Sequence, residues 1–511
     1  MSAFRRTLPS RPNLEQQKKL AKDLIDAFRA GDAEAVARFR AELPDKKTVG
    51  LAEAQYVLAR EYGFSSWRDL KQHIESIATN QLPLVERFKK AVHARDADAL
   101  RRLAPERDAL RAIINEPLFG FDSPALVAAN DDPDVVDALL ERGADPNRRS
   151  SWWAGGFHPL YGATPATAPL LLAAGAIPDA CAAAHLDRLD LLSDMLAADP
   201  SRVHERGGDG QMPLHFARSR AAVDLLLAAG ADIDARDIDH RSTAAEWMLD
   251  DVRHPEKSRI AIAEYLVERG ATADIFLAAA LGDTPRARAL LDANPKLLEL
   301  RTGQGDYGEK PPSSFHIYLW TIGSNLTPLQ TAARFRRRDT LEAMRAYASV
   351  EQRLLLACHE GNRDEASAIV ESHPGIIDGL AGPDRRALTD EAWTANAPAV
   401  ELMMELGFDP SARSVSGPTG GTALHCAAWE GSVECVSAIL RYPSGRALIH
   451  TPDTTFNGTP LNWCDHGSLN CHDRRANHAE VARLLLAAGA VVPEMYEASD
   501  EVAAVLRSHE K

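Results

Sequence analysis

Residues 421–443 read GTALHCAAWEGSVECVSAILRYP, and this stretch decides the fold. Thr422 is suited to cap a first short helix, because its side-chain oxygen can accept an unpaired backbone N–H. Gly431 is suited to end that helix. Apolar side chains recur at helical spacing on both sides of this glycine, namely Leu424, Ala427 and Ala428 before it and Val433, Val436, Ile439 and Leu440 after it. The stretch therefore predicts two short antiparallel helices, neither of which can bury its apolar face alone.

The same phrases recur along the chain. The opening phrase returns as MPLH (212–215), TPLQ (327–330) and TPLN (459–462). The closing phrase returns as LLERGADPN (139–147), LLAAGAD (226–232), LVERGATAD (266–274), MMELGFDP (403–410) and LLLAAGA (484–490). Stacked copies of such a unit bury one another's apolar faces, which predicts an elongated helical array with no enclosed pocket.

A second version of the unit lacks the opening phrase but keeps the helix pair. It has a turn residue followed thirteen positions later by proline, as in Gly31 and Pro44, Asp187 and Pro200, Gly282 and Pro295, and Gly361 and Pro374. This constant spacing predicts a second helix of about three turns. The proline would lie just beyond the helix end, because proline cannot continue a helix.

This pattern resembles the ankyrin-repeat family, whose repeats have a period of about 33 residues and a T-P-L-H-x-A phrase. The resemblance implies an all-α ankyrin-repeat solenoid of about eleven or twelve helix-turn-helix units over residues 83–492. Whole-chain features, such as LPSRPNLEQQKKLAKDL (8–24) and LAREYGFSSWRDLK (58–71), also resemble many bacterial ankyrin proteins. They imply a bacterial origin and give little information on the partner.

The rest of the chain divides around this array. Residues 1–11 are expected to form a mobile arm. Residues 12–80 are expected to form an N-terminal helical module that caps the array, with helices at 14–28, 33–43, 51–62 and 67–77 and with Phe64 and Trp67 joining the last two. Residues 493–511 are expected to cap the other end with a polar helix at 497–507. Because the sequence has no long Gly/Ser linker, we expect one continuous body.

The bulk composition narrows the choice of partner. The formal net charge of the 511 residues is −15, and there is no basic stripe of the kind that nucleic-acid binding requires. No apolar run approaches the ~20 residues of a membrane-spanning helix, and the N-terminus lacks the apolar core of a secretory signal. The six cysteines include no CxxC pair, which favours a reducing compartment. A soluble, cytoplasmic protein with no nucleic-acid or membrane partner is the expectation.

Two turn-rich insertions, at residues 148–165 and 303–325, interrupt the repeat and concentrate aromatic side chains. We call them the first and second aromatic insertions. Because tryptophan and tyrosine are favoured at binding hot spots, seven of their residues are candidates for contacting a partner: Trp152, Trp153, Phe157, His158, Tyr307, Phe315 and Tyr318. The alternative is that these side chains fold back and fill space beside shortened helices. By pattern, Trp320 and Ile317 look internal, whereas Trp152, Trp153 and His158 look more available.

Other patterns suggest chemistry only weakly. GQGDYG (303–308) has the glycine spacing of a dinucleotide loop but lacks the preceding strand and following helix. A third insertion, residues 464–478, contains two cysteines and three histidines without the regular spacing of a zinc site. The acidic turn of Asp234, Asp237, Asp239 and His240 is expected to be a solvated edge. His215 and His425 are expected to bond the backbone of the neighbouring turn.

These patterns favour a non-catalytic scaffold or regulator that binds another protein through the concave ankyrin surface, with no cofactor and no metal. One alternative is an effector that a bacterium delivers into a host cell, where the repeats would bind a host protein. A second alternative is an enzyme or metal-binding protein with its site in the irregular insertions.

Overall fold

The computed structural model describes residues 4–6, 8, 14–44, 46, 49–80, 83–103, 107–249, 258–380, 382–414, 420–471, 476–493, 496 and 498–509. The chain divides into two compact units. The first unit comprises residues 1–151 and 158–177, and the second comprises residues 152–157 and 178–511. The described residues contain helices and turns, with isolated β-bridges in place of strands. The predicted all-α fold is therefore confirmed.

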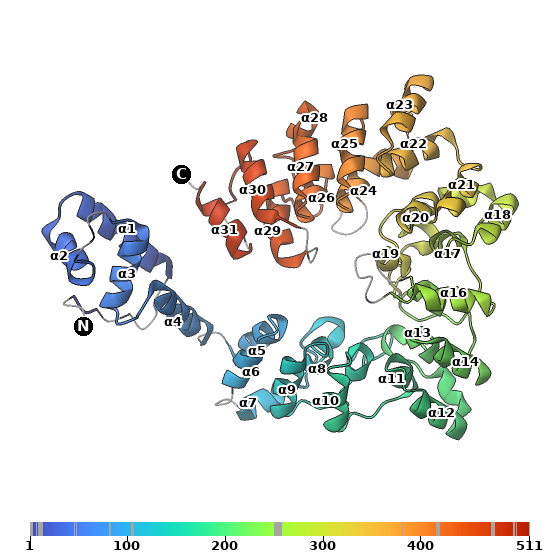
Figure 1. The fold of residues 1–511 in the computed structure, drawn as a ribbon, viewed down its shortest axis with the longest axis horizontal. Coiled ribbons are helices and arrows are strands. Elements are labelled where there is room, and N and C mark those ends of the chain that lie inside the picture. Colours follow the sequence, from blue (N-terminus) through green and yellow to red (C-terminus); the bar gives the residue numbers. More distant parts are fainter. Residues whose placement is uncertain are drawn as a thin grey trace. The chain divides into compact units, whose positions relative to one another are not determined.

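The first unit begins with the predicted helical module. Its helices are α1 (Leu14–Arg29), α2 (Ala33–Glu42), α3 (Leu51–Glu61) and α4 (Trp67–Asn80), each within a few residues of its predicted bounds (Figure 1). Phe64 and Trp67 pack against a core cluster formed by Ala59 of α3 and Leu70 and Ile74 of α4, as predicted. Helices α3 and α4 are therefore held together by a local apolar contact.

The predicted N-terminal arm is only partly described. Arg6 donates its backbone N–H to the carbonyl oxygen of Glu61 at 2.8 Å. Its guanidinium lies 3.2 Å from the buried Glu61 carboxylate, which also pairs with Arg38 at 2.7 Å. Leu8 packs against the cluster between α3 and α4. Residues 1–3, 7 and 9–11 of the predicted arm lie outside the described residues.

Shorter helices continue the first unit. They are α5 (Leu84–His93), α6 (Ala97–Arg102), α7 (Arg107–Ile113), η2 (Gly120–Asp122), α8 (Ala125–Ala128), α9 (Pro133–Glu141), η3 (Pro159–Gly162) and α10 (Ala168–Ala173). Asn147 joins successive turns, because its amide donates to the carbonyl oxygen of Gly175 at 2.9 Å and its oxygen accepts from Ile177 at 2.8 Å. Such side-chain ties hold irregular backbone in register where no strand ladder is present.

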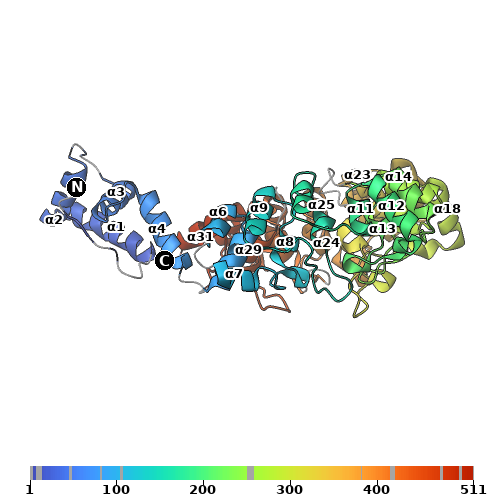
Figure 2. The same cartoon turned by 90° about the horizontal axis from the view of Figure 1, so that it is seen from below.

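The second unit contains the remaining helix pairs. Its elements up to residue 345 are α11 (Ala180–His185), α12 (Leu189–Ala198), η4 (Pro200–His204), η5 (Gly208–Gly210), α13 (Pro213–Phe216), α14 (Arg220–Ala228), α15 (Ala244–Trp247), α16 (Ile260–Glu268), α17 (Ile275–Leu281), α18 (Thr284–Ala293), η7 (Pro295–Glu299), η8 (Gly305–Tyr307), α19 (Tyr318–Thr321), α20 (Pro328–Arg334) and α21 (Arg338–Arg345). Figures 1 and 2 both show α11 to α14 side by side.

The C-terminal half of the second unit repeats this arrangement. Its elements are α22 (Val350–His359), α23 (Arg363–Ser372), η9 (Gly382–Arg386), α24 (Ala387–Trp393), α25 (Ala397–Leu406), α26 (Ala423–Trp429), α27 (Val433–Leu440), α28 (Pro443–Arg446), α29 (Pro460–Asn470), α30 (His478–Ala487) and α31 (Asp500–Arg507). One continuous core cluster runs from Leu354 of α22 to Leu506 of α31. Neighbouring helix pairs therefore bury one another's apolar faces, as stacked repeats do.

The proline spacing gives the predicted helices. Each of α2, α12, α18 and α23 has ten residues and ends two positions before its proline. The predicted second helix of about three turns is confirmed in all four places. The polar tail helix is confirmed as α31, which begins at Asp500.

The histidines of the opening phrase have the predicted structural role. His215 accepts a hydrogen bond from the backbone N–H of Met212 at 3.2 Å, and its Nε2 lies 3.1 Å from the carbonyl oxygen of Ser242. His425 accepts from Thr422 at 3.1 Å and contacts the Gly458 carbonyl oxygen at 3.1 Å. Burial lowers the pKa of both imidazoles, to about 4 for His425. The neutral ring thus ties each helix start to the next turn.

Within the described part of the chain, no helix is both long and apolar enough to cross a lipid bilayer.

Candidate functional site

Residues 152–157 of the first aromatic insertion belong to the second unit and pack against a turn within it. A Cβ on Gly155 would lie 2.1 Å from the carbonyl oxygen of Gly207, so these two backbone segments touch. A Cβ on Gly208 would lie 2.3 Å from the ring of Phe157. Glycine is needed at both positions because any side chain would overlap its neighbour. Residues 152–157 therefore pack on the turn of residues 207–210.

The second aromatic insertion is fixed to the turn of residues 237–242, which we call the 237–242 turn. Arg241 donates to the carbonyl oxygen of Gly308 at 2.8 Å, and the Ser313 hydroxyl donates to that of Ile238 at 2.9 Å. The backbone N–H of Ile317 donates to the Ser242 hydroxyl at 3.2 Å. Further contacts between the two segments are Ser314 N–H to Asp239 Oδ1, His240 Nδ1 to Phe315 O, and Ser314 Oγ to His240 Nδ1. The insertion is thus an ordered part of the second unit.

The 237–242 turn is shaped from within by Asp237. One carboxylate oxygen of Asp237 accepts the backbone N–H of His240 at 2.7 Å, and the other accepts that of Ser242 at 2.6 Å. The carbonyl oxygen of Asp209 accepts the N–H groups of Ile238 at 2.9 Å and Asp239 at 3.0 Å. These bonds bring the turn of one repeat against the turn of the next.

Three ionisable side chains meet at this junction, and we call them the polar cluster: Asp209, Asp239 and His240. His240 Nε2 lies 4.0 Å from Asp209 Oδ2 and 3.9 Å from Asp239 Oδ2. Burial raises the pKa of Asp209 to about 6, against the opposing effects of His240 and the Trp152 indole. The exposed fractions of the three residues are only 7%, 3% and 8%. A buried set of two carboxylates and an imidazole can hold a proton or a cation.

This burial corrects one prediction. The acidic turn was expected to be a solvated edge, and that expectation is wrong for Asp237, Asp239 and His240, all of which are buried. The reason is that the second aromatic insertion covers the 237–242 turn, a contact between residues about 75 positions apart. Asp234 remains partly exposed and accepts hydrogen bonds from Thr272.

Three large apolar side chains remain exposed beside the cluster, and we call them the exposed apolar set: Trp153, Ile238 and Trp320. Their exposed fractions are 45%, 38% and 46%. The Trp320 ring lies 4.6 Å from that of His240, centroid to centroid, and Trp153 lies 6.2 Å from Trp152. The prediction that Trp320 is internal is wrong, whereas Ile317 is buried as predicted. Exposed tryptophan is favoured in binding surfaces.

The other predicted contact residues are less available. Trp152, Phe157, Tyr307 and Phe315 are half-buried. His158 and Tyr318 are buried, so the expectation that His158 is available is wrong. His158 accepts the backbone N–H of Leu160 at 3.1 Å and starts η3, which explains its burial.

Tyr307 and Tyr318 serve the interior of the second unit. Their hydroxyls donate to the two oxygens of the buried Asp274 carboxylate, at 2.7 and 2.9 Å. Asp274 also caps α17 by accepting from Leu277 at 2.8 Å. Burial raises the pKa of both tyrosines, with a further contribution from Asp274. These two side chains therefore fold back onto the repeat.

The GQGDYG loop lacks the surroundings of a nucleotide site. Residues 305–307 form the short η8, no strand precedes them in the described chain, and the next helix, α19, starts only at Tyr318. A pyrophosphate site needs a helix N-terminus directly after the glycines. The dinucleotide reading therefore has no structural support.

The cysteines and histidines of the third insertion do not form one cluster; those described have separate contacts. Cys464 is buried in α29, as predicted, and its thiol lies 3.3 Å from the carbonyl oxygen of His478. The imidazole of His478 lies 2.8 Å from the carbonyl oxygen of Trp429, and burial lowers its pKa. His466 is exposed, and His472 lies outside the described residues.

The sequence analysis did not predict a second buried polar network, which is centred on Glu391. His359 Nδ1 lies 2.8 Å from Oε1 of the buried Glu391, which also accepts from Gln330 at 3.1 Å and from Asn396 at 2.7 Å. The pKa of His359 is raised, because the attraction of Glu391 outweighs burial. The only available signal was a histidine near the end of a helix, which does not identify a partner 32 positions away.

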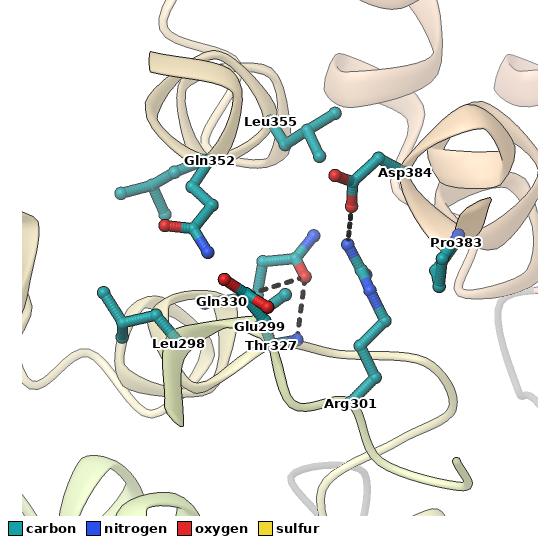
Figure 3. A pocket seen from close by; sticks show the side chains of 10 residues that line it. Leu298, Glu299, Arg301, Thr327, Gln330, Gln352, Leu355, Pro383 and Asp384 are labelled. Atoms are coloured by element: carbon teal, nitrogen blue, oxygen red, sulfur yellow. Dashed lines mark hydrogen bonds and ion pairs between the residues drawn. The ribbon is translucent and has the colours of Figure 1, made fainter. Parts of the chain in front are cut away.

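A pocket of about 270 Å³ lies beside this network (Figure 3). Arg301 points into it and pairs with Asp384, and its guanidinium also donates to the Asn325 carbonyl oxygen at 3.0 Å. Gln330, Gln352 and Leu355 also line the pocket. Because Arg301 is already engaged and Glu299 adds a negative charge, the pocket is poorly suited to an anion.

The comparison with protein families gives a match in three segments of the chain. The ankyrin repeat family matches residues 122–151, 209–238 and 419–453. The second of these segments contains Asp209 and the first two residues of the 237–242 turn, and it ends just before Asp239 and His240. These three segments are therefore similar to ankyrin repeats, and the described residues form the helix pairs of the predicted all-α fold. Ankyrin repeats are protein–protein interaction modules, and the fold is generally non-enzymatic.

Among solved structures, the chain is similar to the ankyrin repeat domain of Bcl-3, described as a unique member of the IkappaB protein family. The identity is 17%, the match covers 46% of this chain and 98% of that domain, and the TM-score is 0.26. It is also similar to the human ASB11 ankyrin repeat domain, with 18% identity, 52% and 98% coverage and a TM-score of 0.22. Comparison with curated protein sequences gives no match.

Proposed function

We propose that the protein is a non-catalytic scaffold or regulator that binds another protein through the repeat turns of its second unit. The observation that carries this proposal is the exposed apolar set of Trp153, Ile238 and Trp320 beside the polar cluster. Large aromatic side chains supply contact area at a low cost in conformational entropy, which is why they dominate binding energetics.

The order of the surrounding backbone supports this role. The first aromatic insertion is packed on the 207–210 turn, and the second is bonded to the 237–242 turn. A preformed surface loses less conformational entropy on binding than a flexible loop does. The formal net charge of −15 favours association with basic partners over nucleic acid, at rates that fall as salt rises.

The proposal is tested with the full chain in a native pull-down from its own cytosol. Trp153→Ala and Trp320→Ala are compared with Phe456→Ala, which removes a still more exposed aromatic side chain elsewhere in the second unit. We expect the two tryptophan variants to weaken partner recovery at least tenfold, as hot-spot truncations do, while all three variants melt within a few degrees of the parent. Equal recovery by all three would contradict the proposed surface.

The proposed setting is the cytoplasm of a bacterium. The alternative of a host-directed effector is separated by running the same pull-down from host lysate. A partner that is recovered only from host lysate, and lost with Trp153→Ala, would favour the effector. An enzyme with a site in the insertions remains the weaker alternative, because polar residues of those insertions serve structural contacts: Tyr307 bonds the Asp274 carboxylate, and His478 contacts the carbonyl oxygen of Trp429.

A further inference from the structure

The polar cluster fixes the proton position on His240. His240 Nδ1 lies 2.8 Å from the carbonyl oxygen of Phe315, and a carbonyl oxygen only accepts. Nδ1 therefore carries the proton, and Ser314 Oγ lies 3.0 Å from the same nitrogen. In the neutral ring, the lone pair is on Nε2, which faces the carboxylates of Asp209 and Asp239. A backbone carbonyl behind one nitrogen, with the other free to coordinate, is the usual setting of a metal-bound histidine.

The two carboxylates are positioned to complete such a site. Asp239 Oδ1 accepts the backbone N–H of Ser314 at 3.1 Å, which leaves Oδ2 on the side of His240. Asp209 is more than nine-tenths buried; the Trp152 indole lies close to its carboxylate, but Oδ1 has no hydrogen-bond partner of normal geometry among the described residues. A buried carboxylate oxygen without a donor is costly unless a cation or proton compensates it.

We propose that Asp209, Asp239 and His240 bind a divalent transition-metal ion, with Zn²⁺ as the reference ion. One ligand atom from each residue lies within 4.8 Å of the others. Zinc bonds of about 2.0–2.2 Å place tetrahedral ligand atoms roughly 3.3–3.5 Å apart, so the two distances of 3.9 and 4.0 Å must shorten by only about half an ångström. One imidazole and two carboxylates suit zinc better than magnesium or calcium, which prefer all-oxygen sites.

Asp237 is excluded from the ligand set, although it lies in the same turn. Both of its oxygens are occupied by backbone N–H groups of His240 and Ser242. It instead holds the backbone that presents Asp239 and His240. Three protein ligands leave a fourth position for water. The bound ion would join the 207–210 turn to the 237–242 turn, at the base of the exposed apolar set.

The test uses the full chain, stripped with a chelator and titrated with Zn²⁺ by calorimetry. We expect a single equivalent to bind, and we expect Asp209→Asn and Asp239→Asn each to weaken binding at least about tenfold. Asp234→Asn is the matched control, because Asp234 lies close in sequence but bonds Thr272 instead. Cys471→Ser and His466→Ala control for the third insertion. Undiminished binding by the two cluster variants would overturn the proposal.

A second measurement on the parent protein does not depend on the folding of any variant. Co²⁺ replaces zinc and reports its ligands by absorption. The proposal expects ligand-field bands without the near-ultraviolet charge-transfer band that a thiolate ligand produces. A thiolate band, or no binding of Co²⁺ or Zn²⁺, would overturn it.

Discussion

His240 lies with its Nδ1 2.8 Å from the carbonyl oxygen of Phe315, although 75 positions separate the two residues. This bond is one of several hydrogen bonds between the second aromatic insertion and the 237–242 turn, in which each segment supplies both donors and acceptors to the other. Because buried backbone groups require partners, the insertion and the turn depend on each other for order. The position of Trp320 against His240 and the burial of the polar cluster both follow from this contact.

Gly155→Ala is predicted to destabilise the second unit by more than about 2 kcal/mol, the range typical of overpacking and backbone strain. Its φ is +150°, and its new Cβ would overlap the Gly207 carbonyl oxygen. Gly230→Ala is the control, with φ of +95° but nothing within 4 Å of the added carbon. It should cost only about 1 kcal/mol. Chemical denaturation measures both, and equal losses would show that residues 152–157 are not packed on the 207–210 turn.

Tyr318→Phe and Tyr307→Phe are each predicted to reduce the free energy of unfolding by about 1–3 kcal/mol, because each leaves the buried Asp274 carboxylate short of a donor. The two effects should be non-additive, since both hydroxyls serve one carboxylate. Tyr347→Phe removes a similar bond to Asp292 at the surface and should cost less than about 0.5 kcal/mol. A double-mutant cycle that gives strict additivity would argue against a shared carboxylate.

Asp390→Asn is predicted to stabilise the protein at pH 8 and to have little effect at pH 4. Burial raises the pKa of Asp390 to about 7 from its ordinary 3.8. The folded state then holds a proton that the unfolded state releases, so wild-type stability falls as pH rises from about 4 to 7. The expected gain is about 2–4 kcal/mol at pH 8, reduced from the full shift because the residue is partly accessible.

The Asp390→Asn comparison is made by thermal melts of both proteins across this pH range. Asp378→Asn, at an exposed position, is the control for the loss of one negative charge. A pH-independent difference between Asp390→Asn and wild type would mean that Asp390 titrates normally.

His425→Gln is predicted to remove a pH dependence between pH 6.5 and 4. Burial lowers the pKa of His425 to about 4 from 6.5, so the unfolded chain binds a proton in this window that the folded chain does not. His425 therefore contributes a loss of up to about 3 kcal/mol as pH falls through the window. Its effect is absent above the unfolded pKa. The variant should lose stability less steeply, whereas the exposed His450→Gln should follow the wild type.

Local features of this protein were predictable because their causes are local. A helix end depends on the residues within one turn of it, so Gly31 and Pro44 bound α2 as their spacing indicates. His215 and His425 were assigned from their place in a repeated phrase, and the fold uses both in the same way. Phe64 and Trp67 were assigned to a helix junction because both flank one turn.

Side chains in the aromatic insertions were harder to place. A tryptophan in such a segment can belong to the core or to an interface. The sequence spacing around Trp153 and Trp320 does not distinguish these two roles. Tyr318 and Trp320 are two positions apart, yet one is fully buried on Asp274 and the other is nearly half exposed. The difference arises from the path by which the second aromatic insertion crosses the 237–242 turn.

The sequence by itself determined the helix pairs, their stacking as ankyrin repeats and the acidic character that disfavours nucleic acid, because periodicity and composition act through neighbouring residues. Only the tertiary structure decided that Asp209, Asp239 and His240 meet in a buried cluster and that the His359 imidazole contacts the Glu391 carboxylate. Such meetings depend on contacts between distant segments, whose closure no short-range pattern encodes.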